Sequence, residues 1–215
     1  MVQGRERSRA ALSDRARARI SELIHNRTLM GGDVVIEQRL AEELGVSRTP
    51  LREALQRLEG EGMVRKTSGR SYLVRKVEFQ EYLQSFKVRL LLEPEAAAAA
   101  TGRAPEAKVQ AVRDEIAALR SLPDDHTEAH WHSDDTLHRL IGTYCGNAVL
   151  FDMIETLRVT TRLYEIQDVR QQVCKDLDQH AAIIESVAAG DGPGARRAMQ
   201  VHLRSLIAHS LRQVA

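Results

Sequence analysis

The stretch RLAEELGVSRTPLREALQRLEGEGM, residues 39–63, decides the fold of the front of the chain. It predicts two short helices joined by a tight turn, in which Gly45 supplies the left-handed residue that ends the first helix. Pro50 suits the first turn of the second helix, where its missing N–H needs no partner, and Ser47 is placed to cap that helix. The second helix has one apolar face, which is made of Leu51, Leu55 and Leu58.

The start of that second helix carries polar side chains off its apolar face. Arg48, Thr49 and Arg52 supply donors that can reach guanine edges and phosphates, as a recognition helix in the DNA major groove requires. The alternative is an ordinary helical hairpin with a solvated charged face. The pattern alone therefore leaves DNA binding and a plain hairpin both open.

The residues on either side favour DNA binding. Residues 63–64 and 72–74 predict two short strands around a bend at Gly69, so that a small hairpin, or wing, follows the helix pair. A helix over about 13–27 is expected to close the core behind the recognition helix. These elements predict a winged helix–turn–helix, whose wing carries basic side chains: Arg65, Lys66 and Arg70.

Length and charge indicate a second domain. A winged helix occupies about 75 residues, whereas the chain has 215, so we expect a DNA-binding domain over 1–76 and a second domain over 77–215. Residues 1–78 hold 16 Lys/Arg against 11 Asp/Glu (+5), and residues 79–215 hold 15 against 19 (−4). A basic front and an acidic rear fit attraction of the front alone to phosphate.

The second domain is expected to be all α, an antiparallel six-helix bundle large enough to enclose a ligand. The fold class is therefore mainly α. The helices are predicted near 79–101, 105–121, 126–144, 147–168, 171–190 and 193–213.

The sequence also indicates where the protein is located. Two cysteines indicate neither a disulfide framework nor a four-thiolate metal site. No apolar run predicts a membrane span or signal peptide, so we expect a cytoplasmic protein.

Histidines and one aspartate of this domain form a candidate metal site. Asp134 and His138 are four residues apart on one helix face, and His180 and His202 lie mid-helix among apolar neighbours. Three neutral imidazoles and a carboxylate suit a divalent transition metal, with zinc as first choice and nickel, iron or manganese as others. The alternative is that each histidine is a hydrogen-bonded core residue. Asp135 also faces His138, from three residues before it.

The front of the chain resembles a known family. GVSRTPLREALQRLEGEGMV, within residues 12–74, is similar to the signature of GntR-family bacterial transcription regulators. The resemblance implies that Ser47, Arg48, Thr49 and Arg52 contact the operator and that the wing-tip Gly69 enters the minor groove, next to Arg70. Gln38 stands where many members carry a DNA-contacting arginine. Ile36 and Ser71 also depart from the pattern, at a helix cap and after the wing tip.

The rear of the chain resembles the FCD ligand-binding domain of the FadR subfamily, in its VanR-like group. The segments DDTLHRLIGTYCGN, DLDQHAAI and QVHL are similar to the family's three metal-ligand segments. The resemblance implies that a metal is bound by the matching residues, and its spacing favours Asp134 over Asp135. The full set of implied ligands is Asp134, His138, His180 and His202.

Arginines of the second domain are candidates for binding an effector. VRLLLEPEAA, residues 88–97, resembles the family's first effector-domain helix, which implies that Arg89 points into the pocket. Arg158 and Arg162 are further candidates, with a solvent-facing charge as the alternative. We expect a small organic acid, held between metal and guanidinium, to change the operator affinity of a homodimer that binds palindromic double-stranded DNA. Repression relieved by ligand is the commoner outcome in the family.

Two other functions remain open from the sequence. In a metal-sensing regulator the ion itself would be the signal. In a metalloenzyme, with Glu185 or Glu155 as general base, the winged helix would have no role, and we therefore expect no enzyme activity.

Overall fold

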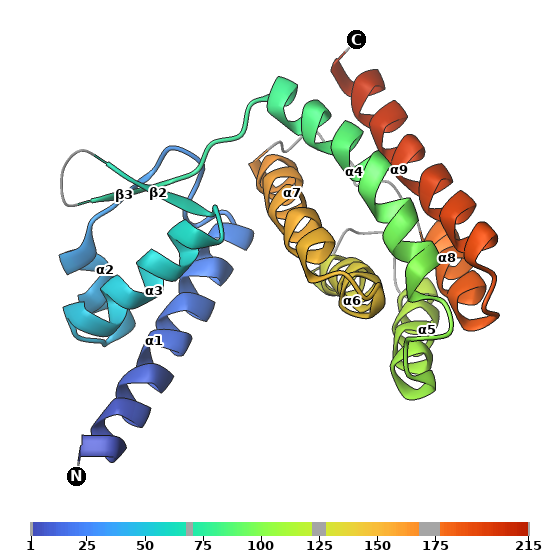
Figure 1. The fold of residues 1–215 in the computed structure, drawn as a ribbon. Helices are drawn as coiled ribbons and strands as arrows, with labels where there is room; N and C mark the ends of the chain where they lie inside the picture. The colour runs from blue at the N-terminus through green and yellow to red at the C-terminus, as the bar shows by residue number, and fades with distance from the viewer. Residues whose placement is uncertain (1, 68–70, 122–127, 168–176, 215) are drawn as a thin grey trace. The chain divides into compact units, whose positions relative to one another are not determined.

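The structure, a computed structural model, describes residues 2–67, 71–121, 128–167 and 177–214 (Figure 1). The described residues up to Tyr82, together with the end of α7 from Val159, form one compact unit, and the rest forms a second. The elements of the first unit, ahead of α4, are α1 (Val2–His25), β1 (Val34–Val35), α2 (Glu37–Leu44), α3 (Arg48–Gly60), β2 (Val64–Lys66) and β3 (Tyr72–Val74).

The predicted helix–turn–helix is formed by α2 and α3. Gly45 ends α2 with φ 63° and ψ 32°, the left-handed conformation expected of it. Pro50 lies in the first turn of α3, as predicted. Ser47 is the N-cap residue of α3, but its hydroxyl makes no capping hydrogen bond, so that part of the prediction is wrong. A cap contributes about 1 kcal/mol, which is less than one fully buried leucine at about 2 kcal/mol, so α3 is held mainly by its buried face.

That buried face packs on α1. Leu51, Leu55 and Leu58 are completely buried, and Ile20 and Ile24 of α1 lie in the same core. The helix predicted to begin near residue 13 begins at Val2 instead. Among the side chains that the structure describes, only one ion pair involves the additional part of the helix, that of Arg9 with Glu53 of α3. Within the predicted range, Asp14 pairs with Arg57 of α3, and Arg17 lies 3.1 Å from Glu61, which directly follows α3.

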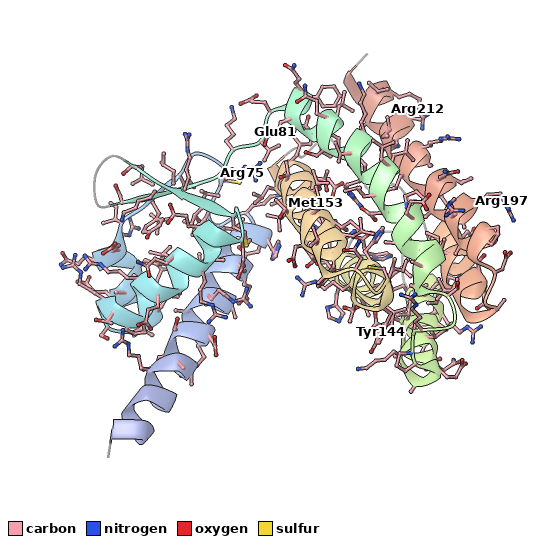
Figure 2. The ribbon with its side chains drawn as sticks, in the orientation of Figure 1. Arg75, Glu81, Tyr144, Met153, Arg197 and Arg212 are labelled. Carbon is pink, nitrogen blue, oxygen red and sulfur yellow. The ribbon has the colours of Figure 1, made fainter. Side chains whose placement is uncertain are left out.

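The wing is part of a three-stranded antiparallel sheet with the order β1-β3-β2. Val64 pairs with Val74, and Val35 with Tyr72. The sequence did not predict β1, because two residues are too few to show the alternation of a strand. After β3, the Arg75 guanidinium pairs with Glu81 in the first turn of α4, where the two side chains are labelled in Figure 2.

Six helices follow in the described part of the chain, which confirms the fold class. Their described ends differ from the predicted ones by a few residues, and two of the predicted junctions, between 121 and 126 and between 168 and 171, fall at least partly outside the described residues. No described helix has both the length and the apolar character needed to cross a bilayer. The helices are α4 (Phe79–Ala100), α5 (Glu106–Arg120), α6 (Glu128–Tyr144), α7 (Ala148–Gln167), α8 (Leu177–Ala188) and α9 (Gly192–Val214).

The core of the second unit lies between these helices. α8 packs against α9 and α5, and α6 packs against α5 and α8. Ala96, Ala97 and Ala100 of α4 are completely buried, so the run of alanines provides close helix packing. Arg196 of α9 donates two hydrogen bonds to Glu95 of α4, at 2.8 and 2.6 Å. The packing brings α4, α6, α8 and α9 around the polar cluster described next.

Candidate metal centre and DNA-reading face

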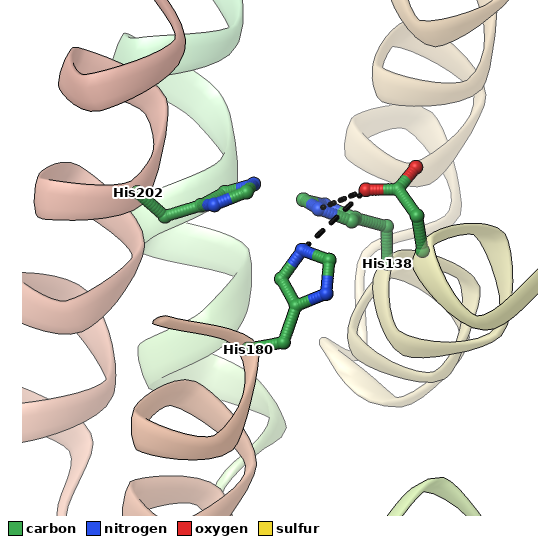
Figure 3. A group of neighbouring side chains, drawn as sticks. His138, His180 and His202 are labelled. Carbon is green, nitrogen blue, oxygen red and sulfur yellow. Dashed lines mark ion pairs between the residues drawn. The ribbon is translucent and has the colours of Figure 1, made fainter. Parts of the chain in front are cut away.

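Four side chains from three helices converge inside the second unit. Asp134 and His138 come from α6, His180 from α8 and His202 from α9, and one donor atom of each lies within 4.8 Å of all the others. The three histidines are buried, and Figure 3 shows their imidazoles turned toward one another. Asp134 Oδ1 is 3.5 Å from Nε2 of His138 and 3.5 Å from Nε2 of His180.

Local sequence explains why the imidazoles point inward. His180 precedes the buried Ile183 and Ile184 on α8, and His202 lies between Met199 and Leu203, both completely buried, on α9. Residues three or four apart share a helix face, so each histidine is on the apolar face of its helix. The imidazole centroids are 4.7 Å apart for His180 and His202, and 5.4 Å apart for His138 and His202.

The donor set fits a divalent transition metal. An ion held tetrahedrally at about 2.0–2.2 Å from nitrogen and oxygen donors separates those donors by about 3.3–3.6 Å. The two distances from Asp134 to imidazole nitrogens fall in this range. Nε2 of His138 is buried and makes no hydrogen bond with the described residues. Such a nitrogen has lost its hydration without a replacement, which metal coordination would provide.

Behind His138 lies a carboxylate that sequence reasoning missed. Glu93 of α4 is 1% exposed; one of its oxygens contacts Nδ1 of His138 and the other accepts a hydrogen bond from Nε of Arg89. Burial raises the pKa of the Glu93 carboxyl, but the Arg89 guanidinium and then His138 lower it by more, so that it lies well below its usual range. Glu93 is therefore a carboxylate, and an acceptor only, at neutral pH.

The charge state of His138 suits a metal ligand. Burial, and then the Arg158 guanidinium, lower the pKa of this imidazole, and Glu93 and Asp134 oppose them less strongly. The neutral imidazole then carries one proton. Because Glu93 accepts at Nδ1, that proton is on Nδ1 and the lone pair is on Nε2, facing Asp134.

The other two sides of the cluster have outer partners as well. Nδ1 of His202 is 3.2 Å from Oε1 of Gln179, another contact that the sequence did not predict. Arg158 is 7% exposed and donates to Asp134 at 2.8 Å and to Asp135 at 2.6 Å. Burial lowers the pKa of Arg158, but the two aspartates raise it by more, so the guanidinium stays charged.

The three candidate effector arginines differ in their surroundings. Arg89 is 3% exposed, and its guanidinium carbon lies 4.6 Å from the centroid of the Phe86 ring. The structure brings Arg89 to the cluster through Glu93, and Arg158 through Asp134. Arg162 is in the part of α7 that belongs to the first unit, and its guanidinium is 3.7 Å from Glu165.

The proposed general bases of a metalloenzyme have surface partners instead. Glu185 accepts hydrogen bonds from Arg113 at 2.8 and 2.6 Å, and Glu155 lies 3.0 Å from Arg139. Neither glutamate belongs to the group of donor atoms around the histidines. Neither of these two glutamates is therefore placed to act as a base at the cluster.

The candidate DNA-reading residues lie at the exposed start of α3. The side chains of Arg48 and Arg52 are 60% and 48% exposed, and Thr49 is exposed between them. Glu37, the first residue of α2, is 8% exposed and accepts a hydrogen bond of 2.7 Å from Nε of Arg52. The Arg48 guanidinium is 3.8 Å from the same carboxylate, so Glu37 lies behind both arginines.

The remaining residues of that face are partly described. Gln38 is exposed on α2, with its amide 3.3 Å from Glu42, whereas Gly69 and Arg70 lie outside the described residues. Sequence reasoning did not assign Glu37, Gln56 or Tyr72 to this face. A surface hollow of about 480 Å³ between α3 and the wing is lined by Glu37, Arg52, Gln56, Lys66 and Tyr72.

Both parts of the chain match known families. Residues 12–74 match the family described as "Bacterial regulatory proteins, gntR family", and residues 84–205 match the family described as "FCD domain". The chain is 29% identical over 222 residues to the putative L-lactate dehydrogenase operon regulatory protein of Escherichia coli (strain K12), covering 89% of this chain and 83% of that protein.

A second relative and a solved structure agree with these matches. The chain is 27% identical over 208 residues to the HTH-type transcriptional regulator LutR of Bacillus subtilis (strain 168), covering 86% of this chain and 94% of that protein. The solved structure of E. coli McbR/YncC is similar in fold, with a TM-score of 0.79 at 20% identity, over 95% of this chain and 99% of that chain.

Proposed function

Since the chain belongs to the GntR family of bacterial regulatory proteins and carries an FCD domain, we propose that a small organic acid bound at a metal site in that domain controls its affinity for operator DNA. As a member of this family it is a DNA-binding transcription regulator and not an enzyme. The observation that carries the proposal is the group of one carboxylate and three buried imidazoles, because a regulator needs no such group to bind DNA.

The DNA-binding domain covers residues 1–76, and it binds the operator through residues of the first unit. Arg48, Thr49 and Arg52 enter the major groove from the start of α3, with Ser47 and Gln38 beside them, and Gly69 and Arg70 of the wing reach the adjacent minor groove. The exposure of Arg48 and Arg52 supports this assignment. The protein acts in the cytoplasm as a homodimer on a palindromic operator, because a two-fold symmetric dimer presents two identical reading heads.

The domain over 77–215 holds the metal and the effector. Asp134, His138, His180 and His202 hold a divalent ion, with zinc as first choice and nickel, iron or manganese as the alternatives. When bound, such an ion supplies a Lewis-acidic position for a carboxylate oxygen. The contact between Glu93 and Nδ1 of His138 supports this assignment, because it leaves Nε2 of His138 directed at the cluster.

The effector is a small carboxylate. Arg89 and Arg158 are buried next to the cluster, and a guanidinium binds a carboxylate through two parallel hydrogen bonds. Both arginines also contact carboxylates of the chain itself, and the five N–H donors of a guanidinium allow it to bind a second carboxylate as well; Arg162 is a third candidate. The E. coli relative named for an L-lactate dehydrogenase operon is consistent with an organic-acid signal. We propose repression that the acid relieves.

A metal-sensing regulator is the second candidate, and one observation favours it. Four protein donors complete a tetrahedral shell, which is the closed arrangement typical of zinc sites that bind no further ligand. An octahedral ion such as nickel, iron or manganese would instead leave two positions for an acid, and zinc would accept one only by expanding to five-coordination. The two functions therefore differ in whether the ion alone changes DNA binding.

The proposal is tested by measuring operator binding of metal-loaded and metal-free protein, with and without small carboxylates. DNA selected from a random library by the intact chain is labelled, and its affinity for the chain is measured by fluorescence anisotropy at fixed salt. We expect small carboxylates to change the affinity of metal-loaded protein about tenfold, which is a coupling of about 1.4 kcal/mol, and to leave metal-free protein unchanged. A change with metal alone would establish the sensor, and no change with either would refute both.

A further inference from the structure

Helix α4 supplies none of the four proposed ligands, yet its Glu93 side chain contacts one of them, His138. Glu93 is buried to 1% exposure and uses its two oxygens separately, one for Arg89 on the preceding turn and one for Nδ1 of His138. A buried ion pair is a weak source of stability, since an apolar pair of similar volume often replaces it without loss. The arrangement therefore suggests a role beyond stability.

The partners of the ligands differ in charge and in hydrogen-bonding capacity. Gln179, behind His202, can present either its oxygen or its amide nitrogen, because an amide can rotate by 180°. Glu93, behind His138, can only accept, and Arg89 can only donate. The chain Arg89–Glu93–His138 is thus polarised in one direction, and it fixes the proton of His138 on Nδ1.

We propose that Glu93 is a positioning residue that keeps His138 in the tautomer with a free lone pair on Nε2, and that Arg89 makes a carboxylate, rather than an amide, necessary at this position. The inference rests on the proposed metal site. It explains why α4 places a buried carboxylate behind a histidine that already has an acidic neighbour in Asp134. Carboxylate partners of this kind also raise the basicity of the imidazole that binds the metal.

In the variant Glu93→Gln, Arg89 would determine which way the new amide group faces. Arg89 would take the amide oxygen of the new side chain, because a guanidinium cannot accept a hydrogen bond. The amide nitrogen would then face Nδ1 of His138 and donate to it. A neutral imidazole that accepts at Nδ1 carries its proton on Nε2, which is the nitrogen that the metal needs.

Metal affinity of the full chain tests this. Zinc and cobalt(II) affinities are measured by competition with a chelator, and the visible absorption of bound cobalt(II) reports its coordination. We expect Glu93→Gln to weaken binding about 10–100-fold, the usual effect of losing an outer partner. The matched control is Glu95→Gln on the same helix, which removes the same charge from an exposed pair with Arg196 and should stay within about twofold of wild type.

A double variant separates the tautomer from the loss of charge. With Arg89→Met added to Glu93→Gln, the amide is free to rotate and to offer its oxygen to His138, so metal affinity should recover by about tenfold over the single variant. Equal affinities of the single variant and the Glu95→Gln control would overturn the proposal. So would a double variant that binds no more tightly than Glu93→Gln alone.

A measurement on unmodified protein keeps the proposal testable if these variants do not fold. Long-range ¹H–¹⁵N correlation spectra of metal-free protein distinguish the two neutral tautomers of each histidine. The proposal predicts that His138 is protonated at Nδ1, and a proton on Nε2 would overturn it. If wild-type protein binds no metal while His138 shows the predicted tautomer, the proposed metal site fails and the tautomer assignment survives.

Discussion

At the start of α3 and at the histidine cluster, a buried glutamate contacts a side chain of the candidate site, but that side chain is exposed at α3 and buried at the cluster. At α3, buried Glu37 lies behind Arg52 and Arg48, whose side chains are about half exposed. In the second unit, buried Glu93 lies behind His138, which is itself 2% exposed. A charge pair open to water contributes at most about 1 kcal/mol and exchanges easily, whereas a buried one fixes geometry. The difference suits the two proposed roles, since the arginines of α3 would exchange Glu37 for DNA, whereas His138 would keep its orientation toward a metal.

Substitution of the metal-ligating histidines should have the largest effect. It should abolish metal binding in the second unit and leave the α3 face unchanged. The double variant His180→Ala/His202→Ala leaves two donors, too few for a stable tetrahedral site, so stoichiometric metal should fall to none. Elemental analysis of purified protein measures this. The control His132→Ala changes an exposed histidine of α6 and should keep full metal content. Full retention in the double variant would refute the assignment.

Loss of core packing under α3 should come next. Leu55 is completely buried, and Leu55→Ala should lower the free energy of unfolding by about 2–5 kcal/mol through lost burial and the cavity left behind. Chemical denaturation measures the difference. Leu91→Ala, at a position that is 72% exposed on α4, should change it by less than about 0.5 kcal/mol. Equal effects would show that α3 does not depend on its apolar face.

A smaller effect is expected at the exposed arginine itself. Arg52→Ala should weaken operator binding by about 1–3 kcal/mol, since that is the value of a good base contact, with the fold unchanged. Fluorescence anisotropy at fixed salt measures it. Arg57→Ala, in the last turn of the same helix, is the matched control and should have little effect. Unchanged binding by Arg52→Ala would remove this residue from the reading face.

The smallest effect should come from restoring an arginine to α2. Gln38→Arg should strengthen operator binding by about 0.2–1 kcal/mol, the value of an exposed charge contact, and steepen its dependence on salt. Gln110→Arg on α5 makes the same change in the second unit and should alter neither quantity. If the two variants behave alike, Gln38 lies away from the DNA, and the gain reflects net charge alone.

The helix–turn–helix could be predicted from the sequence because its signals are local. Gly45, Pro50 and the three buried leucines act within a few residues of their own positions, and the structure places them as expected. Strand β1 was missed because two residues carry no periodicity. The predicted capping hydrogen bond of Ser47 is absent, and α3 is held by burial of the leucines instead.

The cluster could be predicted only in part. The four-residue spacing of Asp134 and His138 is visible in the sequence, and the resemblance to the FCD domain grouped them with His180 and His202. Glu93 is 45 residues from His138 along the chain, and Gln179 is 23 residues from His202, so neither contact leaves a local pattern. The spacing of Arg89 and Glu93, four residues on one helix, was the available signal for their ion pair.

Anomalous X-ray scattering from crystals of the protein as purified tests the central claim most directly. Data collected on either side of the absorption edges of zinc, nickel, iron and manganese locate an ion and identify it. We expect one ion per chain, bonded to Nε2 of His138 and to Asp134, His180 and His202. Crystals grown with a saturating amount of each metal that show peaks only elsewhere would contradict it.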